Sequence, residues 1–478
     1  MAREDPPERL ARADAQRSRA RILEAARRLF TDDARATTAQ VAAAAGVSRS
    51  TLHRHFPTRL DLVRALERPL PAGRLGRAEP LALEALHVLD EVAPHLVPEQ
   101  LVAEARRIAG VPVALYVIDV DGSALLRLAG EEGELPDRLD VALGLGQEIA
   151  PDSLPDLYRH LEAELPGCVA APLWLRGRAT GILLAIGSPR GPLTEIARQG
   201  AAALELANRY TDAFEAVRRR RATSPAAEMQ LNLVPDARIL RIGGGELAGG
   251  LLASPAVGGD WFDFAENRDG TWIAIADAAG EGPVAAGRAA VSLGALRSAR
   301  RQALDLAPSA RVIEETVRQL GEAFTVSAVL ARWRAPTASF SWIACGHPAP
   351  LLVRADGSVE PLAEDDGEPA LGAGDARRAF RVRERRLHAG ERIVLCSDGL
   401  LERRATNGDA FGVAGVARAV ATATSGTAAA TARAIQHAAA GASQQPLEDD
   451  VVIVVLAVGS AESSGDVTPR RARDIHSA

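Results

Sequence analysis

Two aspartates beside apolar runs constrain this chain more than any other feature. Residues 256–282 read AVGGDWFDFAENRDGTWIAIADAAGEG, where Asp260 opens one strand-like run and Asp277 closes the next. The segment NRDG between the runs is a hairpin signal. If residues 268 and 269 form a two-residue loop, Asp260 faces Asp277 directly, with Cβ atoms about 4.5–5.5 Å apart. Like charges that close raise a pKa or require a cation.

Two later segments place more carboxylates beside apolar runs. RIVLCSDGL leads a buried-type strand into Asp398, and LEDDVVIVVLAV places Asp449 and Asp450 just before another strand. Each aspartate taken alone is typical of a turn. Carboxylates at four strand ends predict an oxygen-ligand cluster for two ions, Mn²⁺ or Mg²⁺. Such a pair can activate a bridging water and hold a phosphoryl group for in-line attack.

Composition narrows the remaining chemistry. The 478 residues predict two to four domains at roughly 100–200 residues each. The sequence contains no lysine, so all 56 basic residues are Arg, which excludes a Walker A lysine and Schiff-base chemistry. The three cysteines form no C-x-x-C pair and predict neither a disulfide framework nor a zinc site, so we expect a cytoplasmic protein. Because no run of about 18 apolar residues occurs, we expect no membrane partner.

Positive charge is concentrated at the N-terminus. Residues 1–70 hold 14 Arg against 9 Asp and Glu, a net charge of +5. The whole chain is −6, which leaves −11 for residues 71–478. A basic head on an acidic body predicts an anionic partner for the head alone.

Helical patterns in this head flank a turn at Gly46. TTAQVAAAAG predicts a helix capped by Thr37 or Thr38, and Ser48 caps the next helix, RSTLHRHF. A helix, a glycine turn and a second helix rich in polar side chains are typical of a helix-turn-helix. The alternative is a helical cap with solvated arginines.

The second helix supplies the candidate DNA contacts, because short hydroxyls reach base edges and Arg reaches guanine or phosphate. The candidates are Arg49, Ser50, Thr51, His53, Arg54, His55 and Arg59. The stretch RILEAARRLF…TTAQVAAAAGVSRSTLHRHFPTRLDLV resembles the N-terminal domain of the TetR family of transcription regulators. The resemblance implies DNA binding through residues 17–68, and we expect a homodimer.

Residues 82–195 mix helix and strand patterns. CVAAPLWLRGRATGILLAIG predicts a hairpin that turns at Arg176-Gly177, with Cys168 in the core. This segment resembles a GAF domain, which implies an α+β ligand sensor or dimer scaffold. We expect helix over 196–221, with a short coiled-coil seam that could couple this domain to the next. The seam residues are Ala203, Leu206, Tyr210, Ala213 and Val217.

Eight motifs follow in order through residues 229–458. They are MQLNLVP, VGGDWFDF, IADAAGEGPVAAGRAA, FTVSAVLARW, CGHPAPLLVRADG, LHAGERIVLCSDGLLE, FG at 411–412 and DDVVIVV. Together they resemble a PPM-type serine/threonine phosphatase of the RsbU/SpoIIE kind. The resemblance implies an α/β/β/α sandwich with two metal ions in its cleft. It also implies a phosphorylated regulatory protein, an anti-anti-sigma factor, as the substrate.

The resemblance assigns roles to individual residues. The catalytic and metal-binding residues it implies are Asp260, Asp277, Asp398 and Asp449, together with the carbonyl of Ala278. Asp450 is the alternative to Asp449, and Asp263 is expected to support the site without binding metal. His347 in CGHPAP is expected to fix a turn rather than to act in catalysis.

One departure favours a different function. The family motif GDVSGHG reads ADAAGEG here, so Glu281 stands where a His is common. The alternative hypothesis is therefore a TetR-like DNA-binding regulator whose phosphatase-like domain is weakly active or inactive.

The expected organisation is a multidomain chain with an all-α head, an α+β middle and the sandwich. Its segments are a disordered arm at 1–16, the DNA-binding domain at 17–68, a linker at 69–81, the GAF-like domain at 82–195, a helical linker at 196–228, the phosphatase domain at 229–458 and a disordered tail at 459–478.

Overall fold

The computed structural model describes most of the chain beyond residue 91 and part of the head. The described residues are 21–23, 25–26, 37–56, 92–130, 133, 135–191, 193–219, 224–254, 258–321, 324–362, 368–375 and 377–459. The predicted arm at 1–16, the linker at 69–81, Arg59 and the tail beyond residue 459 lie outside these ranges. None of the described helices is both long enough and apolar enough to cross a membrane.

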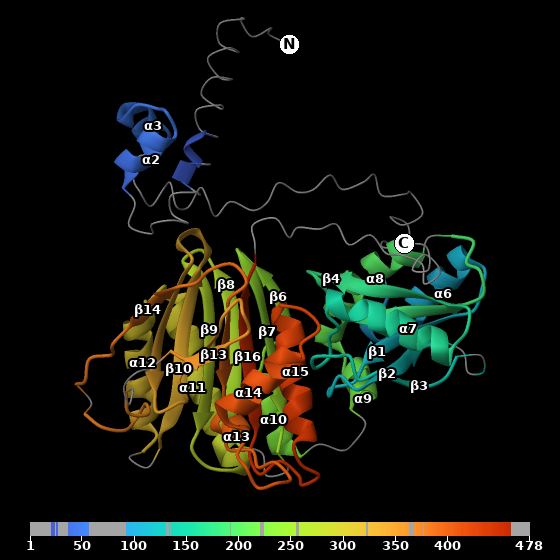
Figure 1. The fold of residues 1–478 in the computed structure, drawn as a ribbon. Coiled ribbons are helices and arrows are strands. Elements are labelled where there is room, and N and C mark those ends of the chain that lie inside the picture. The colour runs from blue at the N-terminus through green and yellow to red at the C-terminus, as the bar shows by residue number, and fades with distance from the viewer. Residues whose placement is uncertain are drawn as a thin grey trace, which may run out of the picture.

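The head contains the predicted pair of short helices (Figure 1). Thr37 caps α2 (Thr38–Ala44), and the side chain of Gln40 completes a capping box with it. Gly46 turns the chain at a φ of +62°, a left-handed conformation that glycine adopts without strain. The Ser48 hydroxyl then accepts from the Thr51 N–H and caps α3 (Arg49–His55).

The middle domain is built on one antiparallel sheet of five strands in the order β3-β2-β1-β5-β4. Its strands are β1 (Val113–Ile118), β2 (Ala124–Ala129), β3 (Arg138–Asp140), β4 (Cys168–Leu175) and β5 (Arg178–Ile186). The predicted hairpin is confirmed, because Leu175 pairs with Arg178 across Arg176 and Gly177. Both loop residues have positive φ, as the tight turn requires.

Helices cover both faces of this sheet. Apolar residues of α6 and α8 pack on one face, and those of α7 pack on the other with Tyr116. The helical segments are η1 (Pro94–Leu96), α6 (Val97–Ala109), η2 (Pro151–Ser153), α7 (Leu154–Glu164), α8 (Leu193–Ala207), η3 (Asn208–Tyr210) and α9 (Ala213–Arg218).

The helix predicted over 196–221 is interrupted. Helix α8 ends at Ala207, and the chain is extended at Thr211 before α9 begins. The Thr211 hydroxyl accepts from the Ala213 N–H, which favours a new helix start over continuation. Phe214 is buried in the middle-domain core, so packing overrides the heptad spacing. Leu206 and Tyr210 of the expected seam are 61% and 78% exposed.

The C-terminal domain contains two antiparallel sheets. One has the order β14-β11-β10-β9-β8 and the other β13-β12-β15-β16-β7-β6. The strands are β6 (Ile239–Ile242), β7 (Gly245–Leu252), β8 (Asp260–Asn267), β9 (Gly270–Ala278), β10 (Val326–Arg334), β11 (Ser339–Cys345), β12 (Leu351–Val353), β13 (Val359–Pro361), β14 (Arg383–Arg386), β15 (Arg392–Cys396) and β16 (Val451–Val458).

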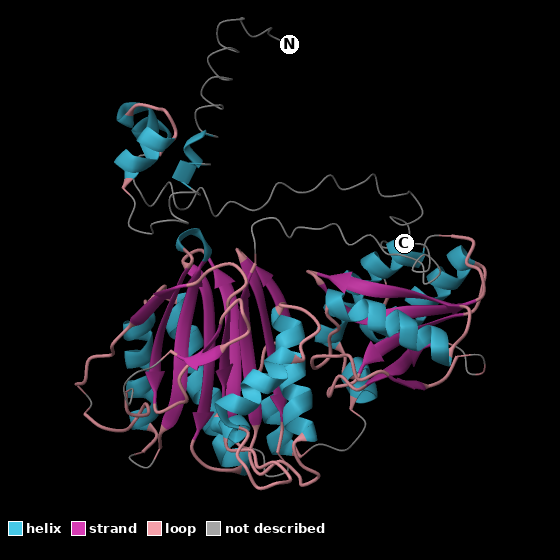
Figure 2. Cartoon of the chain, viewed as in Figure 1, coloured by secondary structure: helices cyan, strands magenta, loops and turns pink. Residues whose placement is uncertain are grey.

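The sheets face each other across a shared core and carry helices on their outer faces (Figures 1 and 2). Phe262 and Trp333 of one sheet meet Leu395 and Val454 of the other in this core. Alternate residues of the strands point outward, against α11 and α12 on one side and α14 and α15 on the other. The helices are α10 (Pro225–Leu233), α11 (Gly282–Arg301), α12 (Leu306–Gln319), η4 (Ala335–Thr337), α13 (Asp398–Leu401), α14 (Gly412–Ala421) and α15 (Ala428–Gly441).

Residues 143–153 of the middle domain pack against the C-terminal domain. The Glu148 carboxylate, 2% exposed, is paired with Arg178 and accepts the N–H groups of Arg238 and Ile239 at 2.9 and 2.8 Å. Leu145 lies within the core formed by β7, β16 and α15. The two domains therefore share buried apolar surface as well as polar contacts.

The core between the two sheets yields a stability prediction. Phe262 is fully buried, and a Cβ added to Gly249 would lie 2.3 Å from its ring, so the site is tightly packed. We expect Phe262→Ala to lower the free energy of unfolding by about 3–5 kcal/mol because it leaves a cavity. Urea denaturation of the purified chain measures this. Val284→Ala, at a 62% exposed position, is the control, with an expected change within about 0.5 kcal/mol. Equal urea midpoints for Phe262→Ala and wild type would contradict the tight packing around Phe262.

Candidate metal centre

The register of the β8–β9 hairpin brings the first two aspartates together. Asn267 pairs with Gly270, so residues 268 and 269 form the two-residue loop that the sequence predicts. Every later pair keeps this register, and Asp260 faces Asp277 at the far end of the ladder. The predicted register is confirmed.

The other two aspartates reach the same place from the second sheet. Asp398 opens the short helix α13 directly after β15, and Asp449 precedes β16. These two strands are neighbours in the sheet, with Cys396 paired to Ile453. The carboxylates of Asp398 and Asp449 both act electrostatically on Asp277. Strand ends from both sheets thus form one acidic cluster, the aspartate cluster (Asp260, Asp277, Asp398 and Asp449).

Burial and mutual repulsion disfavour the ionised form of this cluster. Asp260 is 2% exposed, and burial, followed by repulsion from Asp277, raises its pKa well above the ordinary range. Burial and the carboxylates of Asp398 and Asp449 raise the pKa of Asp277 to about 7. The pKa of Asp449 is also raised, chiefly by burial. A cation would relieve this repulsion.

The neighbouring residues Asp449 and Asp450 have different roles. Asp450 is fully buried, and its carboxylate accepts the N–H groups of Ser254 and Gly258 at 2.7 and 2.8 Å, together with the side-chain amide of Gln230. Both of its oxygens are therefore occupied by protein donors. The Asp449 side chain is exposed, and its Oδ1 accepts only the Asp450 N–H at 2.7 Å among its described contacts. Although oxygens of Asp260, Asp449 and Asp450 lie within 4.8 Å of one another, this geometry favours Asp449 as a ligand.

Two glycines let the backbone approach the cluster closely. A Cβ at Gly259 would lie 2.0 Å from the carbonyl oxygen of Ala278, and a Cβ at Gly399 would lie 2.2 Å from that of Asp450. Real Cβ atoms do not approach carbonyl oxygens that closely, so only glycine fits either position. The Ala278 carbonyl therefore lies beside the strand that begins with Asp260.

The donor set fits a hard divalent cation. Oδ1 of Asp260 is buried, and no described protein group donates a hydrogen bond to it. The carboxylates around it supply only oxygen atoms, the donors that Mg²⁺ and Mn²⁺ prefer. An ion at this point would satisfy the orphan oxygen and offset the repulsion among the carboxylates.

The structure also describes three further residues singled out from the sequence. Asp263 is 4% exposed and pairs with Arg297 at 3.0 Å and Arg300 at 2.9 Å, so its charge is already neutralised. Burial lowers the pKa of His347 to about 4, and its Nδ1 lies 3.3 Å from the Pro348 carbonyl oxygen. Glu281 is exposed at the start of α11 and makes no side-chain capping bond.

One residue of the site was missed by the sequence reasoning. Gln230 lies in MQLNLVP and is 1% exposed, with its amide nitrogen against Asp450 and the main-chain oxygen of Asp260. A buried amide on a helix of low amphipathicity gives no periodic signal, since α10 buries only this side chain and Ala226. Only the tertiary structure reveals its position.

The predicted DNA contacts divide into two groups on α3. Arg49 and His53 are exposed on the helix, and His55 is half-buried. The hydroxyls of Ser50 and Thr51 lie 2.9 and 2.8 Å from that of Ser48, so they take part in the helix cap. The side chain of Arg54 lies outside the described part of the structure, as does Arg59.

Comparisons with known families match both ends of the chain. Residues 267–459 match the family model of Stage II sporulation protein E (SpoIIE), and residues 22–66 match bacterial regulatory proteins of the tetR family. The HTH-type transcriptional repressor LfrR of Mycolicibacterium smegmatis is 46% identical over 68 residues, which cover 14% of this chain and 36% of LfrR. The chain thus spans about a third of the length of that relative. It carries a SpoIIE-type phosphatase domain and a tetR-type DNA-binding domain.

Solved structures with a similar arrangement include three bacterial proteins. The SiaA-PP2C domain of Pseudomonas aeruginosa has 22% identity and a TM-score of 0.38, covering 44% of this chain and 85% of its own. The RsbU and RsbW domains of Rv1364c from Mycobacterium tuberculosis have 24% identity and a TM-score of 0.40, covering 48% and 63%. SpoIIE of Bacillus subtilis, its phosphatase domain with a regulatory fragment, has 17% identity and a TM-score of 0.39, covering 45% and 63%.

The raised pKa of Asp277 predicts how stability depends on pH without metal. Unfolded, this carboxyl ionises near its ordinary pKa of 3.8, but folded it ionises near 7. The folded state therefore loses stability as pH rises between these values, and the loss is complete above pH 7. We expect metal-free Asp277→Asn to unfold several degrees above metal-free wild type at pH 8. The difference should vanish near pH 4.

Thermal unfolding in a chelator, at several pH values, measures this effect. Asp212→Asn makes the same charge change at an exposed position and is the control. If Asp277→Asn melts below wild type at pH 8, the carboxylates of the cluster do not destabilise the metal-free folded state.

Proposed function

We propose that this protein is a metal-dependent protein serine/threonine phosphatase. The convergence of four aspartates from two facing sheets, within a region that matches the SpoIIE family, carries this proposal. Two ions, Mn²⁺ or Mg²⁺, would be held by Asp260, Asp277, Asp398 and Asp449, with the carbonyl of Ala278 as a further ligand. The substrate class is a phosphoserine or phosphothreonine on a regulatory protein, for which the family suggests an anti-anti-sigma factor.

The residues of the cluster have separable tasks in this reaction. When bound, the ions lower the pKa of a shared water and polarise the phosphoryl group. Asp260 and Asp277, which face each other across the hairpin, would hold the ions from the first sheet. Asp398 and Asp449, both exposed, would hold the ions from the second sheet. In this proposal the attacking group is water, which needs no serine or cysteine nucleophile.

The N-terminal modules supply the proposed control. The middle domain, whose resemblance to a GAF domain is a prediction from sequence, would act as a sensor or dimer scaffold. Its buried contact through Glu148 with the start of β6 gives a physical route from that domain to the phosphatase domain.

Hydrolysis of p-nitrophenyl phosphate tests the proposed activity. We expect turnover that requires Mn²⁺ or Mg²⁺ and is lost in a chelator. Asp277→Ala and Asp398→Asn should each lower kcat more than about 100-fold, because each removes a metal ligand. Asp212→Asn is the matched control and should leave the rate unchanged. If both ligand variants keep their activity while remaining folded by circular dichroism, the proposed site is wrong.

A second function is favoured by the head. The tetR-family match and the exposed Arg49 and His53 on α3 support a DNA-binding regulator. In that alternative, Glu281 marks a phosphatase domain that is weakly active or inactive. The two functions are compatible in one chain, and reading a two-fold operator would require a second copy of the protein.

Duplexes selected from a random-sequence pool by the full-length chain provide the DNA test. Fluorescence anisotropy at increasing salt should give binding that weakens steeply, with a slope set by phosphate contacts. Arg49→Ala should weaken binding by about 1–3 kcal/mol if it reads a base, or reduce the salt slope by about 1 if it contacts phosphate. Arg107→Ala, an exposed arginine of the middle domain, is the control. If the selection yields no duplex that binds, even at low salt, this function is excluded.

A further inference from the structure

Helix α10 carries one buried polar side chain into the interior of the phosphatase domain. Gln230 is 1% exposed, and its amide nitrogen lies 3.2 Å from the main-chain oxygen of Asp260. The same nitrogen donates to Oδ2 of Asp450. Both neighbours are acceptors, so the amide must present its two N–H groups to them. The orientation of the side chain is therefore fixed by chemistry.

These two hydrogen bonds connect the two sheets beside the aspartate cluster. Asp260 begins β8 in one sheet, whereas Asp450 immediately precedes β16 in the other. Asp450 also accepts from the N–H groups of Ser254 and Gly258, which precede β8. Gln230 therefore spans the junction at which the Asp260 strand meets the Asp449 strand.

The opposite face of the Gln230 amide lacks a protein partner. Its Oε1 is buried, and no described group donates to it. The Oδ1 of Asp260 is likewise buried, and no described group donates a hydrogen bond to it. Because the Gln230 amide nitrogen bonds the main-chain oxygen of Asp260, both acceptors lie close to Asp260, beside the candidate metal centre.

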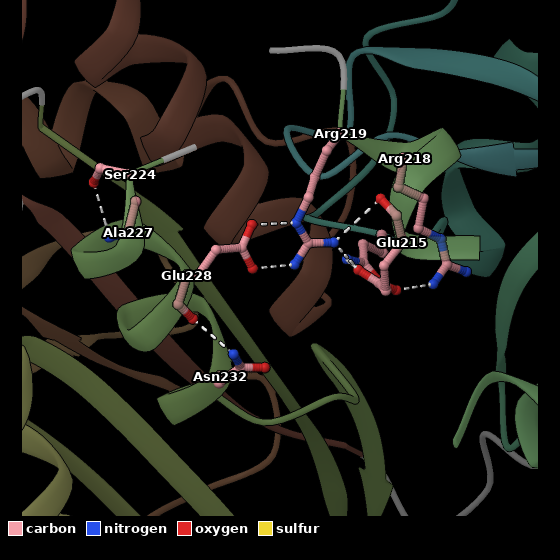
Figure 3. Close-up of polar contacts among 8 residues, drawn as sticks. Glu215, Arg218, Arg219, Ser224, Ala227, Glu228 and Asn232 are labelled. Atoms are coloured by element: carbon pink, nitrogen blue, oxygen red, sulfur yellow. Dashed lines mark hydrogen bonds and ion pairs between the residues drawn. The ribbon is translucent and has the colours of Figure 1, made fainter. Parts of the chain in front are cut away.

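Helix α10 is itself held by an ion pair to Arg219, the residue that follows α9. Arg219 donates from Nε and Nη2 to the two carboxylate oxygens of Glu228 at 2.6 and 2.8 Å, a bidentate geometry (Figure 3). Its remaining Nη1 contacts Glu215, which also pairs with Arg218. Glu215 in turn accepts from Gln147 of the middle domain at 3.3 Å.

Glu228 and Gln230 are two residues apart on one short helix. A shift of α10 along or about its axis therefore moves both contacts together. The ion pair sets where α10 lies relative to α9, and Gln230 sets where the cluster lies relative to α10.

We propose that Gln230 is a positioning residue that sets the spacing of Asp260 and Asp449 for divalent metal, and that the Arg219–Glu228 ion pair holds it in place. The proposal rests on the proposed phosphatase function. It assigns to α10 the task of relaying the position of the middle domain to the metal centre.

Titration calorimetry of Mn²⁺ into the full-length chain tests this assignment directly. Gln230→Met keeps the size of the side chain but removes both donors. We expect its Kd for Mn²⁺ to rise about 10-fold or more, within the range for residues that support a ligand. In p-nitrophenyl phosphate hydrolysis at saturating Mn²⁺, kcat should fall while KM changes less than twofold.

Two controls on the same helix separate positioning from general destabilisation. Ala226→Gly loosens α10 at a buried position without touching the cluster, so it should lower Tm but leave the Mn²⁺ Kd unchanged. Asn232 is exposed, and among its described contacts its side chain bonds only to the Glu228 carbonyl. Asn232→Ala should therefore change neither Tm nor the Mn²⁺ Kd. If Ala226→Gly weakens Mn²⁺ binding as much as Gln230→Met does, the assigned role is overturned.

A double-mutant cycle tests the link to the ion pair. Glu228→Gln should weaken Mn²⁺ binding less than Gln230→Met does, because the ion pair acts only through the helix. If the effect passes through Gln230, the double variant should bind Mn²⁺ no more weakly than Gln230→Met alone. Additive losses would overturn the relay.

The outcomes distinguish this proposal from the proposed function. Wild type that binds Mn²⁺ and hydrolyses phosphate, together with a Gln230→Met variant of equal affinity, overturns the positioning role alone. Wild type that binds no Mn²⁺ overturns both.

Discussion

Repulsion among closely held carboxylates is the constraint on which the rest of the phosphatase domain depends. Two unit charges about 5 Å apart repel by roughly 3 kcal/mol at an effective dielectric constant of 20. The hairpin places Asp260 against Asp277, and the second sheet adds Asp398 and Asp449 to the same cluster. Rigid paired strands hold the four carboxylates in place against this repulsion. A small divalent cation bound among the carboxylates would offset this repulsion.

The surrounding structure supports the cluster in several independent ways. Asp450 ties the segment before β8 to the start of β16 through two main-chain N–H groups. Gly259 and Gly399 allow two backbone segments to approach each other where any side chain would clash. Asp263 is neutralised by Arg297 and Arg300 and so adds no further charge to the site.

Local patterns predicted much of this fold, because they act over a few residues. The NRDG turn set the hairpin register, and with it the facing pair of aspartates. The caps at Thr37 and Ser48 placed the two helices of the head. By contrast, the coiled-coil seam was wrong because the helix breaks after Ala207 and Phe214 packs into the middle-domain core. Long-range packing of this kind leaves no periodic signal in the sequence.

The candidate site likewise combines features that local sequence predicts with features that only the tertiary structure reveals. Strand-end aspartates could be recognised individually, and the spacing of the hairpin joined two of them. The distinction between Asp449 and Asp450 required knowing which carboxylate accepts three protein donors. Gln230 was missed because an amide is unremarkable in sequence until its two acceptors, 30 and 220 residues away, are brought to it.

The most direct test of the central claim is anomalous diffraction at the manganese edge from crystals of the full chain grown with Mn²⁺. The account predicts strong peaks between the β8–β9 hairpin and the Asp398 and Asp449 strand ends, within ligand distance of Asp260 and Asp277. Crystals that contain Mn²⁺ only at other positions, with Oδ1 of Asp260 bound by a protein donor or by water alone, would contradict it.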